Sequence, residues 1–222
     1  MTLAQRLASV HQVIERCGRN PDEVSIVAVT KGFGVEACIE ARDAGLRMLG
    51  ENRVHEALRK QEALTASGLA PDQMPVEWHL IGHLQTNKVR QAAGRFALIQ
   101  SVDSVRLAVE LAKGRPAQAA LVEVNVAREE QKHGLDPSAA LAGIVAIAGL
   151  IDVRGLMAMG PSQGDPGPAF EELRQLRDEA EQRLGRGLPV LSMGMSSDFE
   201  AALTAGSTML RLGQVLFGPR PR

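Results

Sequence analysis

Short apolar runs alternate with amphipathic segments along this 222-residue chain. Eight runs rich in Val, Ile, Leu and Met are nearly continuous in their apolar character, which is typical of strands that are buried on both faces. They lie at residues 25–31, 47–51, 77–82, 97–102, 119–126, 153–159, 188–194 and 208–213. The pattern therefore predicts eight parallel strands.

The segments between these runs have the period of helices, and several end at a glycine, a common helix stop signal. The predicted helices lie at residues 35–45, 52–68, 86–94, 105–114, 137–148 and 169–185. Asp136 and Pro137 fit the N-cap and the first helical position of the helix at 137–148. Residues 1–18 form a further helix, whose apolar stripe consists of Leu3, Leu7, Val10, Ile14 and Cys17.

Alternation of strand and helix implies parallel strands joined by right-handed crossovers. Eight such units in about 200 residues predict an α/β fold, a single (β/α)8 TIM barrel with an extra N-terminal helix. A doubly wound open sheet is the alternative. No linker or low-complexity segment interrupts the chain, so residues 1–222 are expected to form one domain, with the helix at 1–18 packed on the barrel.

Composition narrows the classes of function. The 25 Lys and Arg residues nearly balance the 26 Asp and Glu residues, so neither a nucleic acid nor an anionic membrane is an expected partner. The most apolar stretch, residues 139–151, has 13 uncharged residues and is too short to span a bilayer. Two cysteines do not make a disulfide framework, and the N-terminus does not resemble a signal peptide. These features predict a cytoplasmic protein.

Two cations lie where apolar strands would meet the rim of the barrel. Lys31 ends the first run, and Arg211 stands inside the last one, where a buried guanidinium needs an acceptor. A structural ion pair would satisfy Arg211, and so would the ring nitrogen of a ligand. Since the first and last strands are neighbours in a closed barrel, both cations are expected at the same mouth.

The loops after the last two strands have the features of a phosphate site. Ser197 and Glu200 have the spacing of a helix capping box, and the hydroxyls of Ser196 and Ser197 could bind an anion. Gly213 and Gln214 could add backbone N–H donors after the eighth strand. Taken alone, the serines are more simply explained by an ordinary capped helix, since most boxes of this spacing only cap. Barrel enzymes, however, often bind phosphate with these two loops.

A lysine, an arginine and a phosphate loop on one rim indicate pyridoxal 5′-phosphate (PLP), with Lys31 as the Schiff-base amine. The sequence GFGVEA after the first strand is a weak match to a dinucleotide-binding turn, which leaves a nucleotide-binding module as an alternative. His79 and His83 are four residues apart, which on a strand means roughly 13 Å. We therefore interpret them as turn or core histidines and expect no metal site.

The chain closely resembles the PLP homeostasis protein family, which is related to the N-terminal barrel domain of alanine racemase. The resemblance rests on VAVTKGFGVEA, GENRVHEA, WHLIGHLQTNKVR, VEVNVAREEQKHGL, LSMGMSSDFEAAL and GSTMLRLGQVLFG. It implies that Lys31 carries the cofactor, that Arg211 approaches the pyridine nitrogen, and that Asn52 lies near the cofactor. It also places Ser196 and Gly213 at phosphate-binding positions.

The resemblance further implies a role in vitamin B6 homeostasis, in which the protein buffers PLP or delivers it to PLP-dependent apoenzymes. We expect the chain to be a monomer. The alternative is a racemase-like enzyme with weak activity. The related racemases use a tyrosine as a second base, whereas this chain contains no tyrosine. A carrier without efficient turnover is therefore the favoured interpretation.

Overall fold

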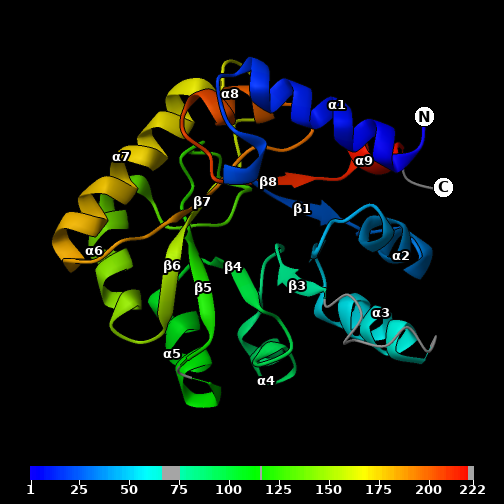
Figure 1. Cartoon of the computed structure of the whole chain (residues 1–222). Helices are drawn as coiled ribbons and strands as arrows, with labels where there is room; N and C mark the ends of the chain where they lie inside the picture. The colour runs from blue at the N-terminus through cyan, green and yellow to red at the C-terminus, as the bar shows by residue number, and fades with distance from the viewer. Residues whose placement is uncertain (67–75, 116, 220–222) are drawn as a thin grey trace.

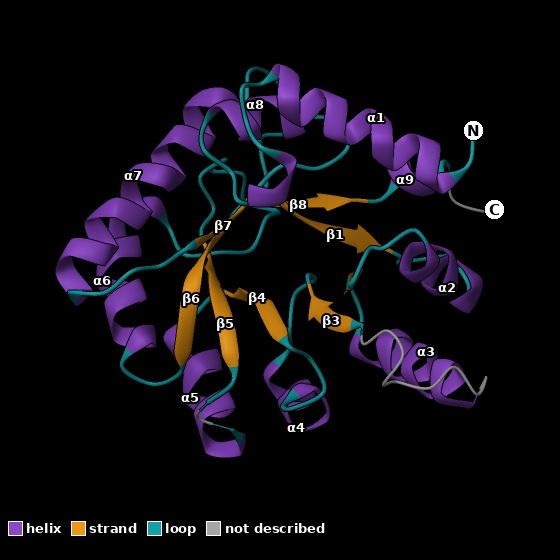
Figure 2. Cartoon of the chain, viewed as in Figure 1, coloured by secondary structure: helices purple, strands orange, loops and turns teal. Residues whose placement is uncertain are grey.

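The computed structural model describes residues 1–66, 76–115 and 117–219, and in them parallel strands close into a barrel in chain order. Figures 1 and 2 show the strands at the centre and the helices around them. The strands are β1 (Ser25–Val29), β2 (Met48–Glu51), β3 (Glu77–Leu80), β4 (Leu98–Val102), β5 (Ala119–Glu123), β6 (Asp152–Met157), β7 (Val190–Ser192) and β8 (Met209–Leu212).

The (β/α)8 barrel predicted from the sequence is confirmed, and the open-sheet alternative is wrong. β1 pairs with β8, with Ser25 opposite Met209 and Val27 opposite Arg211, so the sheet has no edge between its first and last strands. Each predicted apolar run contains one of the strands, except that β6 begins one residue before its run. Most strands end earlier than predicted, which leaves Lys31 in the loop that follows β1.

Each predicted helical segment corresponds to a described helix, although the one predicted at residues 86–94 is much shorter, and the helix after β8 was not predicted. The described helices are α1 (Leu3–Arg16), α2 (Val35–Asp43), α3 (Val54–Ala66), α4 (Val89–Ala92), α5 (Val105–Gly114), α6 (Pro137–Ala148), α7 (Gly167–Leu184), α8 (Phe199–Thr204) and α9 (Gln214–Phe217). Residues 67 and 68, the predicted end of the helix at 52–68, lie outside the described residues. Asp136 caps α6 as predicted, since its side chain accepts from the N–H of Ser138. None of the helices in the described ranges is long and apolar enough to cross a membrane.

The N-terminal helix α1 lies against α8 and α9 (Figure 1). Its N-terminus carries a capping box made by Thr2 and Gln5, and its apolar stripe buries Leu3, Val10 and Ile14. Arg6 donates to the carbonyl oxygen of Leu216 at 3.2 Å. Helices α1 and α9 are thereby held together beside the barrel.

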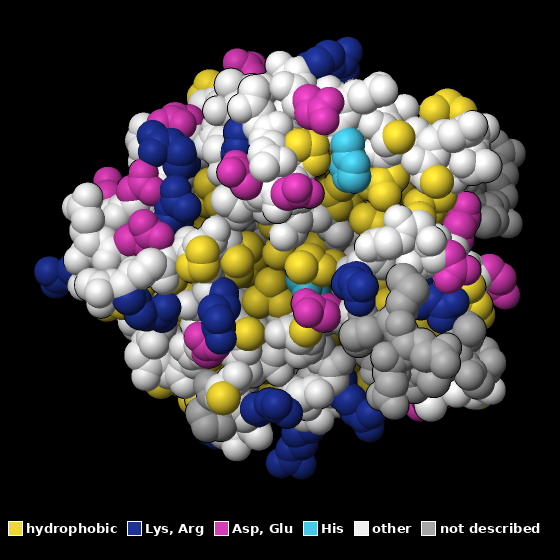
Figure 3. Space-filling model, in the orientation of Figure 1, with side chains coloured by type: hydrophobic (Ala, Val, Ile, Leu, Met, Phe, Trp, Pro, Cys, Tyr) yellow, Lys and Arg dark blue, Asp and Glu magenta, His cyan; other side chains and the backbone are white. Residues whose placement is uncertain are grey.

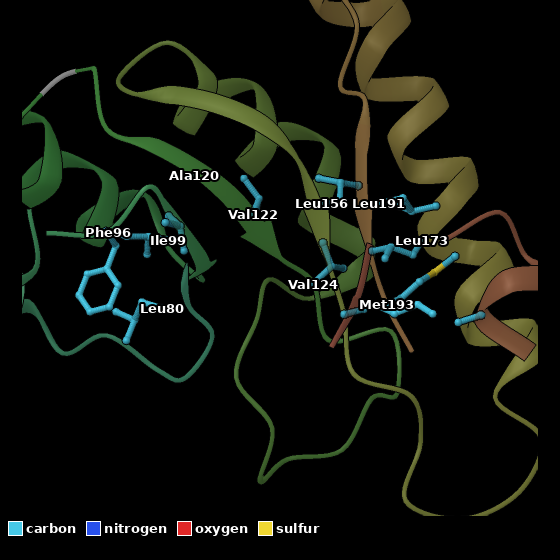
Figure 4. Close-up of a cluster of buried hydrophobic side chains, with 14 of the residues drawn as sticks. Leu80, Phe96, Ile99, Ala120, Val122, Val124, Leu156, Leu173, Leu191 and Met193 are labelled. Carbon is cyan, nitrogen blue, oxygen red and sulfur yellow. The ribbon is translucent and has the colours of Figure 1, made fainter. Parts of the chain in front are cut away.

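Two hydrophobic clusters correspond to the two faces of the barrel strands. Alternate residues point to opposite faces of a strand, and one cluster, which includes Val27, Leu121 and Met157, gathers side chains from one face. The larger cluster lies between strands and helices, where Leu173 of α7 packs near Leu191 of β7 (Figure 4). On the molecular face shown in Figure 3, hydrophobic side chains gather at the centre and charged ones surround them.

Candidate functional site

A cavity of about 580 Å³ lies at the ends of the barrel strands and their following loops. Carboxyl ends of barrel strands are the usual place for chemistry in this fold. The cavity is lined by Val29, Lys31, Asn52, Ile81, Gly82, His83, Glu123, His133, Met159, Met195, Ser196, Ser197, Arg211, Gly213 and Gln214. All seven residues that the sequence nominates as a ligand site are therefore brought together, although they come from loops far apart in the chain.

Lys31 lies in the turn between β1 and α2, two residues after the end of the strand. Its Nζ donates to the side-chain oxygen of Asn52 at 3.3 Å, and Asn52 follows directly after β2. The turn closes through a hydrogen bond from the N–H of Phe33 to the carbonyl oxygen of Thr30. Gly32 has φ +76°, a backbone conformation that is easy only for glycine.

A buried ionic network holds this turn from behind. Lys60 of α3 donates to the carboxylate of Glu51 at 2.6 Å and to the carbonyl oxygen of Thr30 at 2.8 Å. The hydroxyl of Thr30 donates to the same oxygen of Glu51 at 2.6 Å. Glu56 accepts from Lys60 at 3.1 Å and from the N–H of Gly32 at 2.8 Å. The backbone on both sides of Lys31 is therefore fixed by one network.

Burial is the main influence on the ionisation of this network. Glu51 is completely buried, and its loss of hydration raises its pKa, while hydrogen bonds from Lys60 and Thr30 act in the opposite direction.

The sequence gives only a weak signal of this buried network. Lys60 falls on the apolar stripe of α3, three residues after the buried Ala57, where a charged side chain needs a partner.

Arg211 is buried in β8, and its guanidinium donates three recorded hydrogen bonds. One nitrogen donates to the carbonyl oxygen and the hydroxyl of Ser192, both at 2.8 Å, and the other donates to the carbonyl oxygen of Ala158 at 2.8 Å. These bonds use three of the five N–H donors of a guanidinium. Burial lowers the pKa of Arg211 to about 10, so the group remains a cation at neutral pH.

The loops after β7 and β8 meet at the same cavity. The hydroxyl of Ser196 accepts from the N–H of Val215 at 3.2 Å, which ties one loop to the other. Within residues 1–66, 76–115 and 117–219, the N–H groups of Ser196, Gly213 and Gln214 donate no hydrogen bond. This end of the cavity therefore offers backbone N–H groups and serine hydroxyls, which are suitable donors for an anion.

The predicted capping box of Ser197 and Glu200 is wrong. The residue at the N-cap of α8 is Asp198, and its side chain does not cap the helix. Its carboxylate instead accepts from the N–H of Met195 at 2.6 Å, which closes the loop one step before the helix begins. The helix therefore begins one residue later than the spacing of Ser197 and Glu200 predicts.

Glu123 is a cavity residue that the sequence reasoning missed. It ends β5, its exposed fraction is 3%, and it faces the cavity that Arg211 also lines. Burial raises the pKa of Glu123 to about 7, although Arg211 acts to lower it. The sequence does contain a signal for Glu123. Like Arg211, it is a charged residue within an otherwise apolar run.

We expect Glu123→Gln to gain stability relative to the parent protein as the pH rises. At pH 5 the buried carboxyl is protonated and resembles the amide. Above pH 7 it is ionised at a cost in the folded state, because its pKa there is higher than in the unfolded chain. The difference in unfolding free energy should therefore shift by about 1–3 kcal/mol in favour of the variant between pH 5 and 8. Urea unfolding across this range measures it, and a pH-independent difference would contradict the assignment.

The other candidate residues lie as the sequence suggested. His79 is a core residue, with its ring nitrogen 2.9 Å from the side-chain nitrogen of Gln100, and burial lowers its pKa to about 4. His83 lies at the cavity rim, beyond the end of β3. Gly34, part of the suspected dinucleotide turn, is the N-cap of α2. The closed barrel rules out the open sheet that this motif requires.

Comparisons with known proteins agree with this architecture. Residues 4–221 match the family model described as alanine racemase, N-terminal domain. The pyridoxal phosphate homeostasis protein of Aquifex aeolicus is 39% identical over 227 residues, which cover 98% of this chain and 96% of that protein. Its namesake in Escherichia coli K12 is 37% identical over 230 residues, covering 98% and 97%.

Solved structures give the same result. The structure of PipY from Synechococcus elongatus with PLP bound has a TM-score of 0.83 and 35% identity, and the match covers 98% of this chain and 100% of that one. An alanine racemase from Clostridium difficile has a TM-score of 0.72 at 14% identity and covers 57% of that chain, which shows a shared fold only. The chain belongs to the alanine racemase N-terminal domain family and, within it, to the pyridoxal phosphate homeostasis proteins.

Proposed function

We propose that this protein binds PLP in the cavity, with Lys31 as the amine that condenses with the aldehyde, and that it takes part in PLP homeostasis. In this role a cytoplasmic monomer buffers the cofactor or delivers it to PLP-dependent apoenzymes. One observation supports the proposal most strongly. An amine, a buried guanidinium and a set of anion donors converge on one cavity in a chain whose relatives include a protein solved with PLP bound.

The donor set suits the chemistry of PLP. The cavity volume of about 580 Å³ falls within the usual range of small-molecule sites. Ser196, Ser197, Gly213 and Gln214 offer hydroxyl and N–H donors for a phosphate. Arg211 has donors beyond those used by Ser192 and Ala158, and these suit an unprotonated ring nitrogen.

The same residues favour a carrier over an enzyme with efficient turnover. Bound PLP supplies an electrophilic carbonyl and, when its ring nitrogen is protonated, an electron sink. Arg211 remains a cation at neutral pH, and a permanent charge next to the ring nitrogen opposes protonation there. The chain also has no tyrosine that could serve as a second base. Asn52 orients the amine of Lys31 through the hydrogen bond at 3.3 Å.

The test is to locate the covalent attachment. The purified protein is incubated with PLP, reduced with borohydride and digested, and the modified peptide is identified by mass spectrometry. We expect one pyridoxyl group per chain, attached to Lys31. Attachment to a different lysine, or to several lysines in substoichiometric amounts, would contradict the proposal.

A separate measurement addresses the racemase-like alternative. The PLP-loaded protein is incubated with a panel of amino acids in deuterium oxide, and exchange at the α-carbon is followed by NMR. A carrier should show no exchange above that of free PLP. Exchange above that background for any amino acid would favour the enzyme.

A further inference from the structure

Three polar side chains from separate loops meet at the rim of the cavity. His83 follows β3, Asp103 follows β4, and His133 lies in the loop between β5 and α6. The Nδ1 atom of His83 is 2.9 Å from Oδ2 of Asp103, and the Nδ1 atom of His133 is 4.0 Å from the same oxygen. The two imidazole rings stack with centroids 3.8 Å apart.

These distances are close to those of a metal site with two histidines and one carboxylate. Potential ligand atoms of the three residues all lie within 4.8 Å of one another. Ligand atoms about 2.0–2.1 Å from a tetrahedral zinc ion are roughly 3.3 Å apart, a value between the two nitrogen–oxygen distances observed. Because the rings are stacked, one must turn before both can point at one ion. The side chain of His133 is 54% exposed, so it has the room to turn.

Contacts outside the cluster hold its members in place. Ser104, which caps α5, donates to Oδ1 of Asp103 at 3.0 Å and leaves Oδ2 to face the histidines. The loop that carries His133 is closed by a hydrogen bond from the N–H of Leu135 to the carbonyl oxygen of Glu123 at 2.8 Å. Orientation of ligands by such outer contacts is typical of metal sites.

Close packing also fixes the backbone next to His133. Gly134 has φ +121°, and a Cβ there would come within 2.6 Å of the backbone nitrogen of Asn125. The side-chain amide of Asn125 donates to the carbonyl oxygens of Glu129 and Lys132, at 2.9 Å and 3.3 Å. The position of His133 in this loop is therefore set by the backbone, while its side chain can still move.

We propose that His83, Asp103 and His133 bind a divalent transition metal of the zinc class at the cavity mouth. Two imidazole nitrogens and one carboxylate oxygen are the ligand types that Zn²⁺ and Co²⁺ accept, whereas Mg²⁺ and Ca²⁺ prefer oxygen ligands. Three protein ligands leave a coordination position open. His83 and His133 also line the cavity, so that position lies at its entrance.

The test is a zinc titration of the protein after dialysis against EDTA and removal of the chelator. Isothermal titration calorimetry with ZnCl₂ should give one site per chain, and Co²⁺ should give the visible spectrum of a tetrahedral ion. His83→Ala and His133→Ala should each weaken Zn²⁺ binding by at least about tenfold, since even the loss of an outer contact has an effect of this size. His11→Ala, on α1, is the matched control and should bind as the parent does.

Asp103→Asn keeps the size of the side chain and should also weaken zinc binding. Circular dichroism of each variant shows whether the barrel is intact. If the parent protein binds no stoichiometric zinc, or if His133→Ala binds it as tightly as the parent, the proposal is wrong. The titration is repeated on Lys31→Ala, where zinc binding should persist. Failure of the zinc site and failure of the PLP site are thereby distinguished.

Discussion

Lys31→Ala is expected to eliminate the absorption band that arises when the protein is mixed with PLP. Only an amine can form the covalent link, and Lys31 lines the cavity at the ends of the strands. The proposed phosphate donors at Ser196 and Gly213 remain in the variant, so PLP should still bind without a covalent bond and should be lost on dialysis. The absorption spectrum before and after dialysis measures both effects.

Two further variants test whether the amine of Lys31 is what forms the imine. Lys31→Arg keeps the positive charge but provides no amine that forms a stable imine, so it should also lack the band. Lys113→Ala removes an exposed lysine that pairs with Glu110 at the surface, and it should behave as the parent does. A band that survives dialysis in Lys31→Ala would assign the link to another lysine.

Lys60→Met is expected to lower the unfolding free energy by about 3–5 kcal/mol, the usual cost of breaking a buried ion pair by removing one partner. Methionine keeps the length of the side chain but leaves Glu51 buried without its cation. Thr30 also loses the hydrogen bond to its carbonyl oxygen. The midpoint and slope of urea unfolding at pH 7 give the change.

The control for this variant is an ion pair at the surface. Lys113 and Glu110 lie 2.7 Å apart, but their side chains are 65% and 39% exposed. Lys113→Met should therefore cost about 0–1 kcal/mol. If Lys60→Met lowers the unfolding free energy by no more than this surface variant does, the buried pair of Lys60 and Glu51 is not stabilising. Glu51→Gln combined with Lys60→Met should recover part of the loss, since the uncompensated charge is gone.

The sequence predicted the barrel well because each strand is buried and so appears as an apolar run between helical segments. It also predicted the residues that meet at the mouth, because strand ends meet at one rim in this fold. What it missed depends on side-chain pairing across elements. Lys60 reaches Glu51 from a different element, and α8 begins one residue later than the Ser197–Glu200 spacing predicts, where Asp198 bonds back to the N–H of Met195.

The histidines illustrate the same limit. His79 and His83 are four residues apart in the sequence, and on a strand this spacing is too long for two ligands of one metal ion. The structure places His83 beside His133, fifty residues further along, because loops after β3 and β5 converge on the rim. Spacing within one element cannot reveal a contact between loops that are brought together only by closure of the sheet.

Pairing of β8 with β1 also has a consequence during protein synthesis. Lys31 is synthesised long before Arg211 and Gly213, which follow it by most of the barrel. In the function proposed above, a nascent chain has Lys31 but lacks the other side of the PLP site until β8 has been synthesised. We therefore expect chains that stop before β8 to bind PLP more weakly than the closed barrel does.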